Sequence, residues 1–167
     1  MKRSLLTLLT LVTLTATAQT KFGYVSFNEI LTALPEYAVA EKDLGKLQAN
    51  CEEEIARAEK EINQRYSEYI DGQSNFPEII RVKRQKEIQE LMEKSLAFKQ
   101  EANKTLREAR QERMKPLRDK VSEAIQKVCD NEGYDYILDT DRQPYLAINK
   151  KKGFDVTAAV KKQLDIE

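Results

Sequence analysis

Apolar residues recur along two long segments of the chain at steps of three and four positions. The first stripe comprises Leu44, Leu47, Cys51, Ile55, Ala58, Ile62, Tyr66 and Tyr69. The second comprises Ile88, Leu91, Ser95, Phe98, Ala102, Leu106, Ala109, Leu117, Val121, Ala124 and Val128. This spacing places side chains along one face of an α-helix. The pattern therefore predicts two long helices, each with a narrow apolar face.

Helix-breaking residues mark where these two helices begin and end. Pro35 suits the first turn of the first helix, and Asp71-Gly72 ends it. Residues 71–77 contain Gly, Ser, Asn and Pro, which favour a turn, and the second helix begins at Pro77 and ends near Asn131–Gly133. Two long helices joined by a short turn predict an antiparallel hairpin over residues 36–116, with its tip at 71–77.

The charges of the two segments also favour their pairing. Residues 36–70 contain nine acidic and five basic residues, whereas residues 78–120 contain eight acidic and thirteen basic ones. Exposed ion pairs contribute only about 0.2–1 kcal/mol each, so the apolar stripe must hold the pair together. A hairpin symmetric about position 74 places Pro116 opposite Thr32, and a proline inside a helix bends it. We therefore expect Pro116 to mark a neck between the hairpin and a base.

The base is expected to comprise residues 19–35 and 117–167. Segments 21–27, 134–139 and 145–148 are rich in aromatic and β-branched residues and are predicted to be strands. Short helices are expected at Asn28–Leu34 and Val156–Leu164. Asp139 and Asp141 flank a turn, and we interpret them as turn residues rather than as a catalytic or cation-binding pair.

Apolar side chains occur on both faces of these predicted strands, so the small base is expected to pack against copies of itself. The candidate oligomerisation residues are Phe22, Tyr24, Val25, Tyr136, Ile137 and Leu138. The predicted fold class is α+β and mostly helical: a long antiparallel hairpin on a small β-containing oligomerisation base.

The first residues have the pattern of a secretory signal peptide. Lys2 and Arg3 precede an apolar run that ends in Ala16-Thr17-Ala18, before Gln19. The run is shorter than the roughly 20 residues that span a bilayer. We predict cleavage near Ala18/Gln19, export of the mature chain and no stable membrane insertion, and we exclude residues 1–18 from the fold.

Composition narrows the possible chemistry. Without Lys2 and Arg3 the chain has 26 basic and 28 acidic residues, a balance that does not favour nucleic acid as a partner. The sequence has no histidine, which excludes Ser-His and Cys-His nucleophile pairs and His-containing metal sites. We expect no enzyme activity, metal or cofactor. Cys51 and Cys129 are too far apart in a hairpin to pair, so free thiols are predicted.

Apolar residues gather near the predicted tip and on the second helix. The candidate residues for binding partner proteins, called clients below, are Tyr66, Tyr69, Ile70, Phe76, Ile79, Ile80, Met92 and Leu96. Mobile apolar surfaces can cover many different partners weakly. Alternatively, the tip residues close the hairpin end, and Met92, Leu96 and Phe98 pack within the arm or against a neighbouring arm.

Several short motifs carry a family resemblance. They are Phe22-Gly23-Tyr24-Val25, Leu34-Pro35-Glu36, Pro116-Leu117 and Gly133-Tyr134-Asp135-Tyr136-Ile137-Leu138-Asp139. Their order, on either side of the hairpin, resembles the Skp/OmpH family of periplasmic chaperones over essentially the whole mature chain.

This resemblance implies a trimer with a β-barrel-like body and three helical tentacles. It further implies a cavity that shields unfolded outer-membrane β-barrel proteins from aggregation without ATP. The best-known members are strongly basic and this chain is not, so we carry over no lipopolysaccharide or anionic-membrane site. An envelope structural or adaptor protein, whose hairpin docks to one fixed partner, is the alternative.

Overall fold

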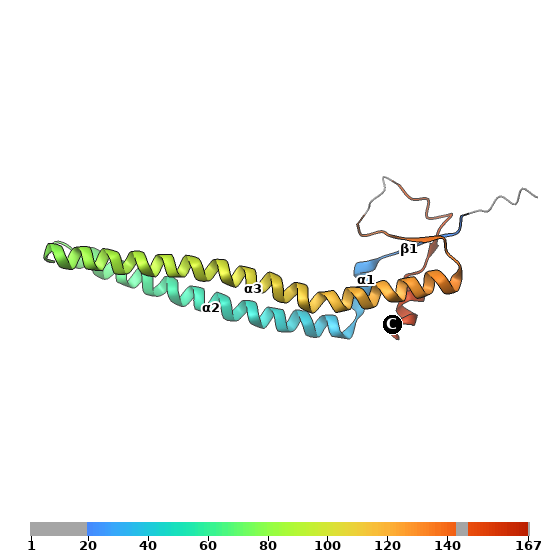
Figure 1. Cartoon of the computed structure of the whole chain (residues 1–167), viewed down its shortest axis with the longest axis horizontal. Helices are drawn as coiled ribbons and strands as arrows, with labels where there is room; N and C mark the ends of the chain where they lie inside the picture. Colours follow the sequence, from blue (N-terminus) through green and yellow to red (C-terminus); the bar gives the residue numbers. More distant parts are fainter. Residues whose placement is uncertain (1–19, 143–146, 167) are drawn as a thin grey trace, which may run out of the picture.

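A long two-helix arm projects from a small mixed base in the computed structural model, which describes residues 20–142 and 147–166 (Figure 1). The elements follow the order β1 (Phe22–Val25), α1 (Phe27–Ala33), α2 (Pro35–Gly72), α3 (Glu78–Glu132), β2 (Tyr136–Asp139), β3 (Phe154–Asp155) and α4 (Thr157–Gln163). The predicted fold class is thereby confirmed. The predicted signal peptide, residues 1–18, lies outside the described residues.

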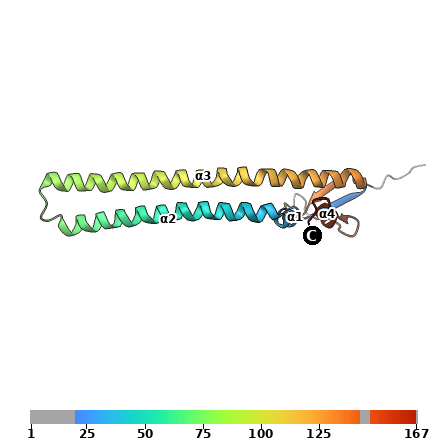
Figure 2. The ribbon, with the colours of Figure 1, turned by 90° about the horizontal axis from the view of Figure 1, so that it is seen from below.

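The arm is an antiparallel pair formed by α2 and the first part of α3, which lie side by side in both views (Figures 1 and 2). Pro35 occupies the first turn of α2, where its missing N–H costs no helical hydrogen bond. Gly133 ends α3 in the left-handed region at φ 65°, which glycine adopts without strain. Both Gly133 and Tyr134 donate their backbone N–H to the Cys129 carbonyl.

The register between the two helices of the hairpin differs from the one expected. Lys120 pairs with Glu36 and Arg113 with Asp43. Pro116 is therefore level with residues near Ala40, and its expected position opposite Thr32 is wrong. The loop between Gly72 and Glu78 is centred at residue 75 rather than 74, which accounts for only part of this shift. Helix α3 continues through Pro116, and Figure 1 shows its axis changing direction where the arm meets the base.

The base contains a three-stranded parallel sheet with strand order β2-β1-β3. Phe22 is opposite Tyr136 in β2, and Gly23 is opposite Phe154 in β3. Parallel neighbouring strands need a long connection between them. In this chain, α1 and the entire hairpin form the connection from β1 to β2. The arm is therefore an insertion between two neighbouring strands.

The third strand differs from the prediction. A strand was expected at residues 145–148, of which 145 and 146 lie outside the described residues and 147 and 148 are not in a strand. Phe154 and Asp155 pair with β1 instead. The following Val156 is 1% exposed, and its N–H donates to the Tyr24 carbonyl at 3.0 Å. Burial of Val156 thus brings this later segment to the sheet.

The hydrophobic core lies between the sheet, α1, α4 and the C-terminal part of α3. Its most completely buried side chains are Val25, Ile30, Leu34, Val121, Val156 and Val160. The same core includes Ala40, Leu44 and Met114, which lie in the arm. The packing of the base therefore continues into the first turns of the hairpin rather than stopping at residues 36 and 116.

Candidate functional site

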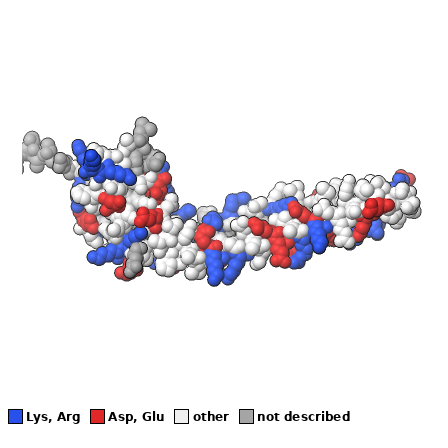
Figure 3. Space-filling view, turned by 180° about the vertical axis from the view of Figure 1, so that it is seen from behind, with Lys and Arg blue, Asp and Glu red and all other residues white. Residues whose placement is uncertain are grey.

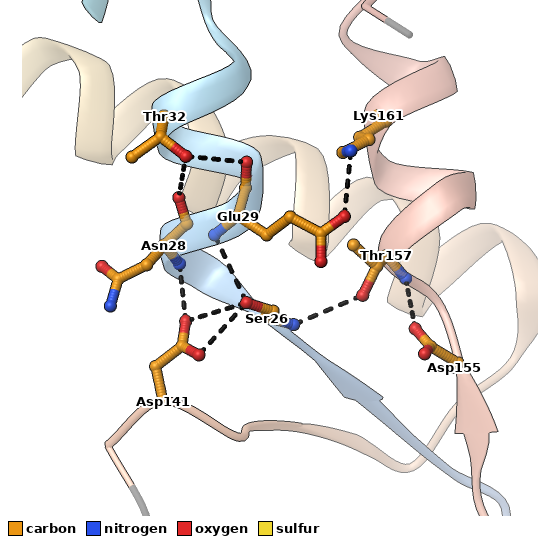
Figure 4. Close-up of polar contacts among 8 residues, drawn as sticks. All are labelled: Ser26, Asn28, Glu29, Thr32, Asp141, Asp155, Thr157 and Lys161. Atoms are coloured by element: carbon orange, nitrogen blue, oxygen red, sulfur yellow. Dashed lines mark hydrogen bonds and ion pairs between the residues drawn. The ribbon is translucent and has the colours of Figure 1, made fainter.

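Polar contacts anchor the root of the arm to the base through the short helix α1 (Figure 4). The Asn28 N–H donates to Asp141 at 2.6 Å, and the Ser26 hydroxyl donates to the same carboxylate at 3.1 Å. Lys161 of α4 pairs with Glu29 at 2.9 Å. The N-cap of α1 is Ser26, whose hydroxyl accepts the Glu29 N–H at 3.3 Å. Asp141 adds a second acceptor at this helix end from a distant part of the chain, within the turn where the sequence placed it.

The apolar contact between α2 and α3 is narrow. Ile88, Ser95 and Ala102 are buried there, as their stripe predicts. Tyr66 and Phe98 are 55% and 42% exposed, so their assignment to the buried stripe is wrong. Charged side chains flank the contact on both sides, and these two large rings remain partly exposed, with Phe98 at its edge beside Leu91 and Ser95.

The tip candidates fall into two groups by exposure. Tyr69 and Phe76 are half-buried. The Phe76 ring packs on Gly72, so that a side chain at position 72 would displace the ring, and the Gln85 amide donates to the Tyr69 hydroxyl at 2.7 Å. These two residues help to close the hairpin end, which was the alternative interpretation for the tip. The others are exposed: Ile79 at 77%, Ile70 at 42% and Ile80 at 37%.

Two grooves run along the arm on opposite sides of a shared floor formed by Ile62 and Ser95. One has a volume of about 240 Å³ and is also lined by Ala58, Leu91 and Phe98. The other has a volume of about 320 Å³ and is also lined by Asn63, Met92, Leu96 and Lys99. We call these the Phe98 side and the Leu96 side of the arm.

Helical spacing assigns further candidates to the two sides. Tyr66 and Ile70 follow Asn63 by three and seven positions, so they lie on the Leu96 side. A groove of about 380 Å³ near the tip is lined by Tyr69, Phe76, Ile88 and Leu91. It shares Glu61, Leu91 and Lys94 with the mid-arm groove of the Phe98 side. The candidates thus divide between two different surfaces, a division that the sequence analysis did not make.

Acidic side chains of α2 meet basic side chains of α3 across the arm. The pairs are Glu36–Lys120, Glu41–Arg110, Asp43–Arg113 and Glu59–Lys99. This polarity follows the opposite net charges of the two segments. Figure 3 shows acidic and basic side chains intermixed along one face of the arm. A surface of mixed charge does not select strongly for a partner of one sign.

Three titratable groups have displaced pKa values, each with a local cause. The hydrogen bond from Lys120 lowers the pKa of Glu36, and that from Lys127 lowers the pKa of Glu123. Burial raises the pKa of Tyr134, and Glu132 raises it further. All three are explained by structural contacts. Within residues 20–142 and 147–166, no cluster of three or more Cys, Asp or Glu side chains is arranged to hold a metal ion.

The candidate oligomerisation residues do not all face outward. Val25 is 1% exposed inside the core, so it is not available to a second copy, and Ile137 packs against the same core. Phe22 and Tyr136 lie on the opposite face of the sheet, with stacked rings whose centroids are 5.7 Å apart. Tyr24 and Leu138 are paired on that face by the strand register and are half-buried.

Several residues of the arm have a buried or exposed position that the sequence patterns did not predict. Met114 is 3% exposed in the core and lies three positions before Leu117, so helical spacing could have found it. Val82, at 58% exposure, adds to the apolar tip, and Val39, at 60%, lies near the arm root. Cys51 and Cys129 are free thiols, as predicted.

Comparison with known proteins agrees with this architecture. No described helix combines the length and apolar composition needed to cross a membrane. No curated protein matches the chain. The family model described as outer membrane protein (OmpH-like) matches residues 21–164, which include the base, both long helices and α4. The protein therefore belongs to the OmpH-like family.

Proposed function

We propose that this protein is a periplasmic, ATP-independent holdase that binds unfolded outer-membrane β-barrel proteins and prevents their aggregation. The observation that carries the proposal is the apolar surface of the arm. Ile70, Ile79, Ile80, Val82, Met92 and Leu96 are large apolar residues with 37–77% exposure. A surface of this kind marks an interaction site. Membership of the OmpH-like family supports the choice of outer-membrane proteins as clients.

In this proposal the arms enclose the client through many weak contacts. The arm buries little apolar surface between its two helices, so local opening costs little free energy. Exposed residues on different faces let one arm adapt to different client segments. Tyr66, Tyr69, Ile70, Phe76, Ile79, Ile80, Met92 and Leu96 remain the proposed client-contacting set, with Tyr69 and Phe76 also shaping the tip.

The base is proposed to join three copies. Strands β2 and β3 lie at the two edges of the sheet and leave their outer sides for pairing with another copy. Phe22, Tyr24, Tyr136 and Leu138 share one face of this sheet by register. Light scattering should give a mass of about three chains, and a monomer would contradict this part of the proposal.

The client-binding proposal is tested by diluting several unrelated urea-unfolded outer-membrane proteins into the mature protein without nucleotide. We expect lower turbidity with all of them and a soluble complex by light scattering. A protein that binds only one of them, through a few anchor residues, would instead be the adaptor. A protein that leaves every client to aggregate would contradict the holdase function and favour the envelope structural or adaptor alternative.

A triple variant with Ile70→Ser, Ile79→Ser and Ile80→Ser tests whether the tip surface carries the activity. We expect weaker suppression of aggregation with unchanged helical content by circular dichroism. The Val39→Ser variant is the control, because Val39 is equally apolar and exposed but lies at the arm root. Full activity of the folded triple variant would remove the tip from the proposal.

A further inference from the structure

The two cavities on the Phe98 side adjoin one another, because Glu61, Leu91 and Lys94 line both of them, and together they form the groove on this side. The groove begins at Phe76 near the tip and reaches Phe98 in the middle of the arm. Along α3 it extends from Arg84 to Phe98, a distance of about 21 Å at about 1.5 Å per residue. An extended chain of about six residues has the same length.

The floor of this groove is apolar and its rim is charged. Its apolar lining residues are Ala58, Ile62, Tyr69, Ile88, Leu91 and the more exposed Phe98, and the buried Ser95 completes the floor. In an extended chain, alternate side chains point in opposite directions, so every second residue could contact the floor while the others point to the rim or to water. The pattern that fits is therefore strict alternation of apolar and polar residues.

The groove on the Phe98 side is also free of ion pairs between its walls. Its rim residues Arg65 and Arg84 pair with Glu68 and Glu87, each on its own helix. Among the described residues, none of the ion pairs that join α2 to α3 crosses this groove. On the Leu96 side, by contrast, Lys99 and Glu59 both line the groove and meet at 2.6 Å. A chain entering the Leu96 side meets that ion pair, whereas on the Phe98 side the neutral hydrogen bond from Gln85 to Tyr69 joins the two helices near the tip.

We propose that the Phe98 side binds client segments as extended strands of about six residues with alternating apolar and polar side chains. This inference rests on the proposed holdase function and specifies its binding mode. The rim carries both acidic and basic side chains, so the proposed ligand is defined by its alternation rather than by net charge. Transmembrane β-strands have this alternation along their length.

Photo-crosslinking provides a matched test, because Ala97 is next to Phe98 in sequence, is exposed and lines none of these grooves. A photoreactive amino acid replaces either Phe98 or Ala97 in the full mature protein. The probe is a labelled eight-residue peptide with alternating Leu and Ser. We expect at least fivefold more crosslinking from position 98 than from position 97. Equal yields, or a higher yield from position 97, would overturn the assignment.

Sequence order in the peptide tests the extended binding mode. A second peptide of the same composition places Leu at helical spacing, three and four residues apart. We expect the alternating peptide to bind at least fivefold more tightly by fluorescence anisotropy, and Leu91→Gln to abolish this preference. The control Ala97→Gln, at an exposed position that lines none of the grooves, should retain it. Tighter binding of the helical peptide would instead assign the groove to a neighbouring helical arm.

These outcomes are separable from the holdase proposal itself. Suppression of aggregation by the same preparations is measured in parallel with unfolded outer-membrane protein. Full suppression without a preference for position 98 or for alternation would overturn the groove and leave the holdase function intact. Failure of the wild-type protein to suppress aggregation would contradict the holdase function, independently of the peptide-binding results. Circular dichroism melting of each variant shows that the arm is folded.

Discussion

The base and the arm of this protein use apolar residues in opposite ways. In the base, Val25, Ile30, Leu34 and Val160 are at most 1% exposed and form one core. In the outer arm, Ile79, Met92 and Leu96 are 56–77% exposed and contribute no comparable core. The comparison indicates that apolar residues in the base maintain the fold, whereas many in the arm are available for binding.

The polar contacts of the two regions differ as well. In the base, Asp141 and Lys161 join segments that are more than one hundred residues apart in sequence. In the arm, some ion pairs, such as Glu53–Arg57, connect residues one helical turn apart, whereas others, such as Glu59–Lys99, join the two helices; both kinds are exposed. Local exposed pairs add little stability and leave the surface adaptable, whereas the long-range contacts fix the arm root on the base.

The largest expected effect is on the stability of the base. Ile30→Ala should lower the free energy of unfolding by about 2–5 kcal/mol, because it leaves a cavity in a fully buried site. Ile88→Ala in the arm is the matched comparison. Its side chain borders an open groove, so its cost should be at least about 1 kcal/mol smaller. Urea unfolding at one fixed protein concentration measures both, and equal costs would contradict the division between base and arm.

Loss of the Asp141 acceptor should have an intermediate effect. Asp141→Ala should destabilise the protein by about 0.5–2 kcal/mol, because the Asn28 N–H loses its acceptor. In this variant, backbone hydrogen exchange should become faster in α1 (Phe27–Ala33) and change less in the outer arm. Asp141→Asn, which retains an acceptor oxygen, is the control and should cost less. Unchanged exchange in α1 after Asp141→Ala would show that this carboxylate does not hold the arm root.

A smaller effect is expected for the ion pair between Glu36 and Lys120. The hydrogen bond from Lys120 lowers the pKa of Glu36 in the folded protein. The pair therefore stabilises the fold at pH values above the pKa that the Glu36 carboxyl has in the unfolded chain. This contribution is lost as the pH falls through the lowered folded pKa. Glu36→Gln should therefore cost less than about 1 kcal/mol at pH 7.

The pH dependence gives this prediction its control. The difference in melting temperature between wild type and Glu36→Gln should shrink in acid and with added salt, since salt screens exposed charges. Glu53→Gln, which breaks a pair within one helix, should have a similar or smaller effect. A difference that grows in acid would contradict the assigned direction of the Glu36 pKa shift.

The smallest effect on stability is expected at the exposed tip. Ile79→Ser should change the free energy of unfolding by no more than about 0.5 kcal/mol, because its side chain is 77% exposed. Thermal melting measures the change, with Val39→Ser as the exposed control near the arm root. A large loss of stability at Ile79 would mean that the tip maintains the fold, as the base core does.

Local sequence patterns anticipated most of the arm because helical periodicity is a local property. The α2 boundaries, Pro35 and Gly72, follow from residues that begin and end helices. The register between α2 and α3 was not predictable in the same way. It is set by contacts between the two helices, such as Glu36–Lys120, and not by symmetry about position 74. Phe98 follows the apolar spacing and yet is 42% exposed, since spacing does not specify how closely two helices approach.

The base was less predictable because its contacts join distant segments. Segment 145–148 has strand-like composition, but Phe154 and Asp155 pair with β1, where Val156 is buried below the sheet. Val25 was a candidate for contact with a second copy, whereas α1 and α4 cover it within one chain. Asp141 was expected only in a turn, and its role as a second acceptor at the start of α1 depends on the folding of residue 141 beside residue 28.

The sequence by itself determined two long amphipathic helices, their turn and their opposite charges, because these properties depend on residues that are neighbours along the chain. Only the tertiary structure decided which strand completes the sheet, which residues the base buries, and how the arm divides into the Phe98 and Leu96 sides. Those features depend on packing between segments that are far apart in sequence, and packing is decided by the volume and shape of all the side chains that meet there.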